Sequence, residues 1–228
     1  MADLSALTAA VEAGDQRTAV AVTEAAIDDG MAAQAILDAM SSAMEVIGGR
    51  FQRNEIYVPE MLISARAMKL ATAVLEPHLV KAGVRPEHTA VIGTVAGDLH
   101  DIGKNLVGMM WKGATIAVVD LGTNVPADRF ASAAVEHGAS LVGISALLTT
   151  TMVGMREAVA AVRAAVPQAV VMVGGAPVTS EFAESIGADG YAADAAAAVD
   201  VARQLLASVP RRVAPGGPAI DQISDPRT

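Results

Sequence analysis

The chain has 228 residues, 53% of them hydrophobic and 3% aromatic, and its formal net charge is −9. This length predicts one large domain or two small ones, with enough apolar residues for a buried core. The negative charge disfavours direct binding to nucleic acid, because a phosphate backbone would repel it. The absence of cysteine excludes disulfides, thiolate metal sites and a cysteine nucleophile.

The N-terminal residues predict neither secretion nor membrane insertion. The stretch MADLSALTAAVEAGD carries acidic residues early and has no basic segment followed by a long apolar run. We therefore expect a cytoplasmic protein that has no membrane partner.

Residues 1–84 are expected to form a helical domain. Apolar residues recur at helical spacing from residue 3 to about 82, and glycines interrupt this pattern at several points. The pattern therefore predicts four or five helices. The last helix is expected to begin at Pro59, because proline suits the first helical turn, and to end before Pro77. Glycine and proline in residues 82–87 are typical of a linker.

Short apolar runs alternate with helical segments in residues 89–210, which predicts an α/β domain. The expected strands are 89–95, 115–120, 141–145, 170–173 and 190–192, and the expected helices are 103–112, 126–137, 151–165, 179–186 and 194–208. Because the strands are apolar almost throughout, they should form a five-stranded parallel sheet covered by helices on both faces, a doubly wound, Rossmann-like (flavodoxin-like) fold. Residues 211–228, rich in Pro and Gly, are expected to form a flexible tail.

The sequence GTVAGDLHDIGKN, residues 93–105, lies where the first strand should end and the next helix begin. In a doubly wound sheet, ligands bind outside the carboxyl ends of the strands. Three other stretches, DLGTN, SALLTTT and GGAP, are expected at the same edge after the second, third and fourth strands. A histidine, carboxylates, hydroxyls and glycines would then converge there, as a ligand site requires.

His100 and Asp98 are the candidates for metal chemistry. An imidazole that binds a metal through one nitrogen usually donates its other N–H to a carboxylate, and Asp98 is two residues away. The other histidines, His78, His88 and His137, are expected outside this edge, so the protein would supply a single ligand. A metal held by one protein ligand is expected to bring its own macrocycle.

Four glycines at this edge are expected to let a large ligand approach the backbone; they are Gly97, Gly103, Gly174 and Gly175. A dinucleotide is the competing ligand. However, GTVAGDLHDIG lacks the G-x-G-x-x-G spacing, and a His–Asp pair is not needed to hold a pyrophosphate.

Each feature taken singly also has a plain structural explanation. The His–Asp pair can be a solvated surface pair, the glycine pair a strand-to-helix turn, and residues 149–151 a helix cap. Lys104 and Asn105 open a helix and are expected to face solvent or phosphate.

Taken together, three motifs follow one another at fixed distances: Asp98-x-His100-x-x-Gly103, then 41 residues, Ser145-x-Leu147, then 26 residues, and Gly174-Gly175. In this pattern the chain resembles the cobalamin-binding domain of corrinoid proteins and of methionine synthase. Residues 44–69 also look like the helical cap module that precedes this domain, so residues 1–84 would be a helical cap domain. The likeness is greatest to the two-domain corrinoid proteins of methyltransferase systems.

The resemblance implies that cobalamin binds base-off, with its own nucleotide base displaced, and that His100 is the lower cobalt ligand (His-on). Asp98 would accept the imidazole N–H, and Thr151, at the position of a serine in methionine synthase, would complete a relay. These three residues are expected to act in the chemistry. The other residues expected to contact the cofactor are Gly97, Asp101, Ile102, Gly103, Ser145, Leu147, Thr149, Gly174 and Gly175 at the sheet edge, and Met44 and Met61 in the cap.

The function that the resemblance implies is that of a corrinoid methyl carrier. Cobalt would accept a methyl group from a substrate-specific methyltransferase, with a methylamine, methanol, a methyl thiol or a methoxylated aromatic compound as the donor. A second methyltransferase would pass the group to a folate or thiol acceptor, and a reductive activator would be the third partner. The chain alone would not be catalytic; it would be the corrinoid subunit of a multi-component, cobalamin-dependent methyltransferase.

Two alternatives are a cobalamin-binding sensor or regulatory module and the small subunit of a cobalamin-dependent mutase. Such sensors carry a tryptophan signature in the helical module, whereas the only tryptophan here is Trp111, in the second domain. The mutase subunits lack the helical cap. The pattern therefore favours the carrier.

Overall fold

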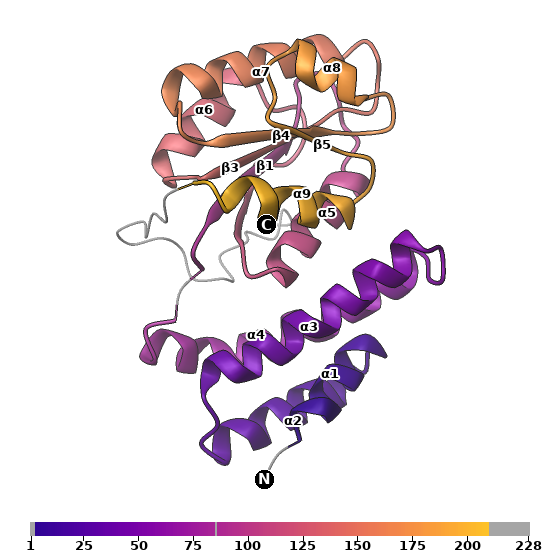
Figure 1. The fold of residues 1–228 in the computed structure, drawn as a ribbon, viewed down its shortest axis with the longest axis vertical. Helices are drawn as coiled ribbons and strands as arrows, with labels where there is room; N and C mark the ends of the chain where they lie inside the picture. Colours follow the sequence, from indigo (N-terminus) through magenta and orange to yellow (C-terminus); the bar gives the residue numbers. More distant parts are fainter. Residues whose placement is uncertain (1–2, 85, 210–228) are drawn as a thin grey trace. The chain divides into compact units, whose positions relative to one another are not determined.

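The computed structural model describes residues 3–84 and 86–209, and the predicted tail, residues 211–228, lies outside the described residues. The chain divides into two compact units, a helical one formed mainly by residues up to 85 and an α/β one formed mainly by the residues that follow (Figure 1). Within the described part, no helix combines the length and the apolar character needed to cross a membrane.

The helical unit contains α1 (Leu4–Glu12), α2 (Gln16–Asp28), α3 (Ala33–Gln52) and α4 (Val58–Lys81). Asp3 and Asp15 cap the first two helices by accepting hydrogen bonds from the N–H groups of Ser5 and Thr18. The side chains buried in this unit are mainly aliphatic and include Leu7, Ile36, Met40, Met44, Ile47, Met61, Leu75 and Leu79. The predicted helical region is therefore confirmed.

The end of α4 was wrong in the sequence prediction. The helix continues through Pro77 to Lys81. Proline removes one hydrogen bond to the carbonyl four residues earlier, at Ala73, and both Pro77 and Ala73 are exposed, so water can solvate that carbonyl. Leu75 and Leu79, on either side, are buried, and their packing favours continuation of the helix.

The α/β unit is a five-stranded sheet in which all strands run parallel, in the order β2-β1-β3-β4-β5. The elements are β1 (Thr89–Thr94), α5 (Ile102–Gly113), β2 (Ala117–Asp120), α6 (Ala127–Glu136), β3 (Leu141–Ser145), α7 (Met152–Ala165), β4 (Val170–Gly174), α8 (Ser180–Ser185), β5 (Gly190–Ala192) and α9 (Ala197–Leu206). This confirms the predicted doubly wound class. Strand β2 starts two residues later than expected, because Thr115 has a φ of 64°, which no strand residue adopts.

Helices cover both faces of the sheet, with α6, α7 and α8 on one side and α5 and α9 on the other (Figure 1). On the first side, valines from β1, β3 and β4 pack with Phe130 and Met155. On the second side, the indole of Trp111 lies over the central strand and donates a hydrogen bond to the carbonyl of Ala198 in α9, at 3.0 Å. The sheet is therefore buried on both faces, as its apolar strands require.

The register brings the carboxyl ends of three strands into line. Thr94 of β1 is paired with Ser145 of β3, which is paired with Gly174 of β4. Strand β1 lies between β2 and β3. From β1 the chain adds β2 on one side and then β3 on the other, so the strand order reverses between β1 and β3. Such a switch point is where doubly wound folds bind ligands.

We predict that Gly143→Ala destabilises the α/β unit by about 1–3 kcal/mol through overpacking. A Cβ at residue 143 would lie 2.7 Å from the Trp111 ring and 3.1 Å from Ile92. Urea unfolding followed by Trp111 fluorescence reports this unit, because Trp111 is the sole tryptophan of the sequence.

The matched control is Gly108→Ala in α5, where a Cβ would make only ordinary contact with Val118 at 3.7 Å. That substitution should leave stability unchanged or raise it by up to about 1 kcal/mol, because alanine favours helix. Equal effects of the two substitutions would contradict the packing described for the sheet.

Candidate cofactor site

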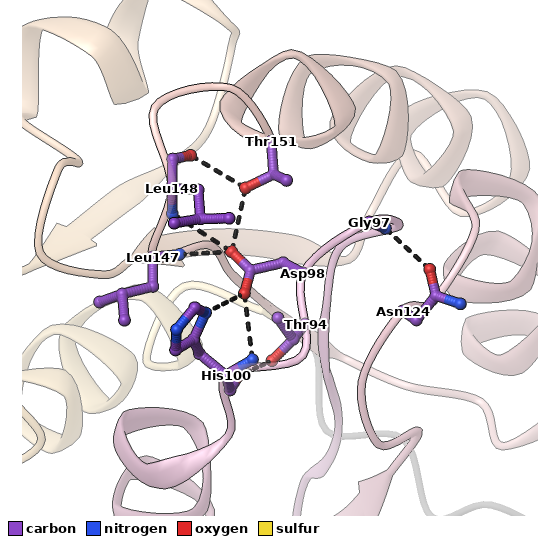
Figure 2. A network of polar contacts seen from close by, with 8 residues as sticks. All are labelled: Thr94, Gly97, Asp98, His100, Asn124, Leu147, Leu148 and Thr151. Atoms are coloured by element: carbon purple, nitrogen blue, oxygen red, sulfur yellow. Dashed lines mark hydrogen bonds and ion pairs between the residues drawn. The ribbon is translucent and has the colours of Figure 1, made fainter.

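The candidate site is built from the loops that follow β1, β2 and β3. Residues 95–101 carry Asp98 and His100, residues 121–126 carry Asn124, and residues 146–151 carry Leu147, Leu148 and Thr151 (Figure 2). The structure thus brings together the first two of the three predicted motifs, the one with Asp98 and His100 and the one with Ser145 and Leu147.

The carboxylate of Asp98 is the centre of the network, although its side chain is 0% exposed. Its Oδ1 accepts hydrogen bonds from the backbone N–H of His100 at 3.0 Å and from His100 Nδ1 at 2.6 Å. Its Oδ2 accepts from the N–H groups of Leu147 at 2.7 Å and Leu148 at 3.3 Å, and from Thr151 Oγ1 at 2.9 Å. One buried side chain therefore links the loops after β1 and β3.

The electrostatics of the site keep Asp98 ionised. Burial by itself raises the pKa of this carboxyl, because it disfavours the charged form. Hydrogen bonds from the backbone of Leu147 and His100, from the imidazole of His100 and from the hydroxyl of Thr151 outweigh burial and hold the pKa well below its usual range. The carboxylate can therefore act only as an acceptor near neutral pH.

His100 presents its outer nitrogen away from this network. Because ionised Asp98 accepts a hydrogen bond from Nδ1, the proton lies on Nδ1 and the lone pair of the neutral ring lies on Nε2. The hydroxyl of Thr94 fixes the backbone by donating to the carbonyl of His100 at 2.9 Å. The side chain is 51% exposed, so Nε2 is accessible to a ligand. The arrangement can hold an imidazole in the tautomer that a metal requires.

Thr151 stands where α7 begins, yet its side chain does not cap that helix. Its Oγ1 lies 2.9 Å from Asp98 Oδ2 and also 2.9 Å from the carbonyl oxygen of Leu148. A hydroxyl has one hydrogen, and the charged acceptor forms the stronger bond. The simple capping explanation for this residue is therefore wrong, and its hydroxyl faces the carboxylate that was predicted to be its partner.

Asn124 and Leu148 belong to the network, although sequence reasoning gave neither of them a role. Asn124 Oδ1 accepts a hydrogen bond from the N–H of Gly97 at 2.7 Å, and its own N–H donates to the carbonyl of Asp98 at 3.0 Å. Its φ is 55°, a conformation in which asparagine is enriched. The sequence offered one signal for Asn124: it is an asparagine that closely follows an apolar strand and directly follows a Gly-Thr pair.

The packing of the chain itself requires a glycine at residue 175. Its φ is 130°, and a Cβ there would lie 1.9 Å from the carbonyl oxygen of Ala146 in the neighbouring loop. The residue before it, Gly174, accepts a hydrogen bond from the N–H of Ala146 at 3.2 Å. The glycine pair therefore lets two loops approach at the carboxyl edge, and its contact with a cofactor stays a prediction.

Aliphatic side chains are exposed in the segments that carry the network. Leu99 and Ile102, on either side of His100 in the sequence, are each 73% exposed, and Leu147 and Leu148 are each 42% exposed. A Cβ at Gly103 would meet open space. Exposed apolar side chains in a binding edge are typical of a site for a large, partly apolar ligand.

The remaining predicted residues are placed in different ways. Asp101 and Thr149 are exposed, and Ser145 is half-buried at the end of β3. Met44 and Met61 are buried side chains of α3 and α4, and their contact with a cofactor stays a prediction.

Lys104 contradicts the sequence prediction, which had it facing solvent or phosphate. It is 3% exposed, and its Nζ donates to Asp120 Oδ1 at 2.7 Å and Oδ2 at 2.5 Å and to Asn105 Oδ1 at 2.6 Å. The cause is the proximity of the first turn of α5 to the end of β2, which offers a carboxylate to the ammonium group. Asn105 in turn donates from Nδ2 to Asp101 at 3.1 Å, so it is committed within the chain.

Within residues 3–84 and 86–209, no group of three or more His, Asp or Glu side chains is placed to hold a metal ion. A metal site made of protein side chains alone thus has no candidate in that part of the chain.

Comparison with known proteins decides the family. A family model described as a B12 binding domain matches residues 88–200, and a second model of the same description matches residues 4–76. A corrinoid protein of Desulfitobacterium hafniense is 36% identical over 212 residues, which are 90% of this chain and 98% of that protein. The chain belongs to the corrinoid proteins that carry B12-binding domains. The resemblance inferred from the three motifs is confirmed.

Other known proteins are similar to this chain over most of their length. The dimethylamine corrinoid protein of Methanosarcina barkeri is 38% identical over 194 residues, 83% of this chain and 91% of the relative. The crystal structure of a cobalamin-binding protein from D. hafniense covers 90% of this chain and 99% of its own, with a TM-score of 0.74 and 29% identity. A chain of the methanol:cobalamin methyltransferase complex of M. barkeri gives a TM-score of 0.80 and 27% identity, with 91% of this chain and 81% of that chain covered.

We predict that Asp98→Asn lowers the free energy of unfolding by about 1–3 kcal/mol at pH 7. An amide has a single acceptor oxygen, so its NH₂ group must face either the donors of His100 or those of Leu147 and Thr151. Urea unfolding measures the loss, and Asp101→Asn, an exposed carboxylate in the same loop, should change stability by no more than about 0.5 kcal/mol.

The difference between the wild type and Asp98→Asn should also depend on pH. A carboxyl whose pKa is lowered by folding stabilises fully above its unfolded pKa, about 3.9, and this stability is lost as the pH falls through the lower native pKa. The difference in stability should therefore shrink between pH 5 and pH 3. A difference that stays constant over this range would contradict a buried, hydrogen-bonded carboxylate.

Proposed function

We propose that the protein is a methyl carrier that binds cobalamin base-off with His100 Nε2 as the lower cobalt ligand. The single observation that carries this proposal is the 2.6 Å contact between His100 Nδ1 and buried Asp98, which in the neutral imidazole places the lone pair on Nε2 of a half-exposed side chain. Membership of the corrinoid protein family supports cobalamin as the ligand.

The residues at the carboxyl edge fit a ligand of this kind. His100 supplies one nitrogen donor, and exposed Leu99 and Ile102 supply apolar surface next to it. When bound, the corrinoid supplies the cobalt centre on which a methyl group is accepted and released. The chain's own residues orient the imidazole, fix its tautomer and hold its proton at Nδ1.

The proton at Nδ1 is the part of the site that the protein can adjust. Asp98 accepts it, and Thr151 donates to the other oxygen of the same carboxylate at 2.9 Å. A stronger hydrogen bond to the carboxylate raises the basicity of the imidazole and so favours ligation, whereas a weaker one disfavours it. We infer that Asp98 and Thr151 set the ligand strength of His100 in this way.

Two partner enzymes and an activator complete the proposal. A substrate-specific methyltransferase would supply the methyl group, a second methyltransferase would deliver it to a folate or thiol acceptor, and a reductive activator would restore the cofactor. Relatives named for dimethylamine and a structural neighbour from a methanol:cobalamin methyltransferase complex support a donor among methylamines and methanol. We place the choice of donor in the partner methyltransferase, because the network described involves the ligand of the cofactor and not a substrate pocket.

The test is methyl transfer by the full-length protein reconstituted with hydroxocobalamin and reduced chemically, with dimethylamine or methanol and the matching methyltransferase. The wild type should accept methyl groups stoichiometrically with cofactor. His100→Ala should retain less cofactor or transfer at least about tenfold more slowly, as expected when an orienting ligand is lost.

Glu136→Gln in α6 is the control, since its exposed carboxylate pairs with Arg129 and lies outside the loops that carry the candidate site. Wild-type protein that retains no cobalamin, or His100→Ala that behaves as the wild type, would contradict the proposal.

A further inference from the structure

The ion pair between buried Lys104 and partly exposed Asp120 is not explained by the proposed function. The side chain of Lys104 is 2% exposed and that of Asp120 is 28% exposed, and the ammonium contacts both carboxylate oxygens. Placing an ammonium in the interior is costly unless the pair is well bonded. The location of the pair, between α5 and the end of β2, suggests what it does.

Asp120 shapes the loop that follows β2. Its Oδ1 accepts a hydrogen bond from the N–H of Gly122 at 2.8 Å, which turns the chain directly after the strand. The carbonyl of Gly122 accepts from the N–H of Thr94 at 3.0 Å, and the N–H of Val125 donates to the carbonyl of Thr94 at 2.9 Å. The loop is thereby fastened to the end of β1.

This loop holds the His100 loop through Asn124. The side chain of Asn124 accepts from the N–H of Gly97, and its N–H donates to the carbonyl of Asp98. Figure 2 shows the contact between Gly97 and Asn124 on the side of Asp98 away from Leu147. The residues around His100 are thus held from both sides, by the β3 loop through a carboxylate and by the β2 loop through an amide.

Lys104 also reaches the other end of the His100 loop. Its Nζ donates to Asn105 Oδ1, and Asn105 donates from Nδ2 to Asp101 Oδ2 at 3.1 Å and from its backbone N–H to the carbonyl of Asp101 at 2.8 Å. Asp101 directly follows His100. A single ammonium therefore connects the segments before and after the imidazole.

We propose that Lys104 and Asp120 are positioning residues that hold the β2 loop and the start of α5 so that the His100 loop keeps one conformation. The proposal rests on the proposed function only for the task of His100, which is to bind cobalt. The pair is not hydrogen-bonded to the imidazole, and it acts through Asn124 and Asn105.

The test compares Lys104→Met and Asp120→Asn with a matched ion pair elsewhere in the same unit. Arg163 of α7 pairs with Asp189, which accepts a hydrogen bond from the N–H of Val171, at the start of β4 and away from the carboxyl edge. Arg163→Met removes a charge of the same sign from that pair. All variants are full-length proteins, and their thermal unfolding is measured first.

The decisive readout is amide hydrogen exchange by nuclear magnetic resonance without cofactor. Lys104→Met and Asp120→Asn should speed the exchange of the Gly97 amide by about tenfold, the effect of weakening one local hydrogen bond by about 1.4 kcal/mol. Arg163→Met should leave that amide unchanged even where it lowers the melting temperature. An unchanged Gly97 amide in both ion-pair variants, or an equal change in Arg163→Met, would overturn the proposal.

Asn124→Gly keeps the experiment decisive if an ion-pair variant fails to fold. Glycine tolerates the φ of 55° at this position and removes only the side-chain acceptor for Gly97. It should raise the exchange of the Gly97 amide as the ion-pair variants do, and an unchanged rate would overturn the link from Asp120 to the His100 loop.

The proposed function is tested separately, by cobalt(II) electron paramagnetic resonance of the wild type reconstituted with hydroxocobalamin. If imidazole ligation is present, the ion-pair variants should show a smaller fraction of imidazole-bound cobalt than Arg163→Met. If the wild type lacks imidazole ligation while the exchange results hold, the proposed function fails and the positioning of the loop stands.

Discussion

A fully buried carboxylate that accepts five hydrogen bonds is the interaction on which the candidate site depends. Burial of Asp98 is unfavourable alone, and only donors brought from two separate loops make it favourable. Those loops adjoin because β1 and β3 pair in register at the point where the strand order reverses. The pairing of β1 with β3 therefore makes it possible for Asp98 to be buried as a carboxylate. That carboxylate in turn fixes the tautomer and the orientation of His100.

Hydrogen bonds within the chain organise the site. Backbone groups supply three of the five donors to Asp98, and the β2 loop restrains the same segment through Asn124. A metal ligand that the fold already orders loses little conformational entropy on binding. Little of the binding free energy is then lost to ordering the loop. Under the proposed function, this would be a physical reason for one histidine to suffice where a macrocycle supplies the other ligands of the cobalt.

The features that depend on local sequence pattern could be predicted from the sequence. Apolar strands predicted the parallel sheet, and the position of the polar and glycine-rich stretches directly after the strands predicted the edge at which they meet. Contacts that depend on strand order were either not predicted or predicted wrongly. Lys104 lies in a polar segment, and only the approach of α5 to the end of β2 explains its burial against Asp120. Asn124 acts through a positive φ that composition does not reveal.

The most direct measurement is the cobalt(II) electron paramagnetic resonance spectrum of protein labelled uniformly with ¹⁵N and reconstituted with unlabelled hydroxocobalamin. Ligation by His100 predicts that each cobalt line is split into two by the ¹⁵N nucleus of the protein, where unlabelled protein gives a three-line splitting. A three-line splitting that persists in the labelled protein would show that the cofactor's own base remains bound. That result would contradict the assignment of His100 as the cobalt ligand.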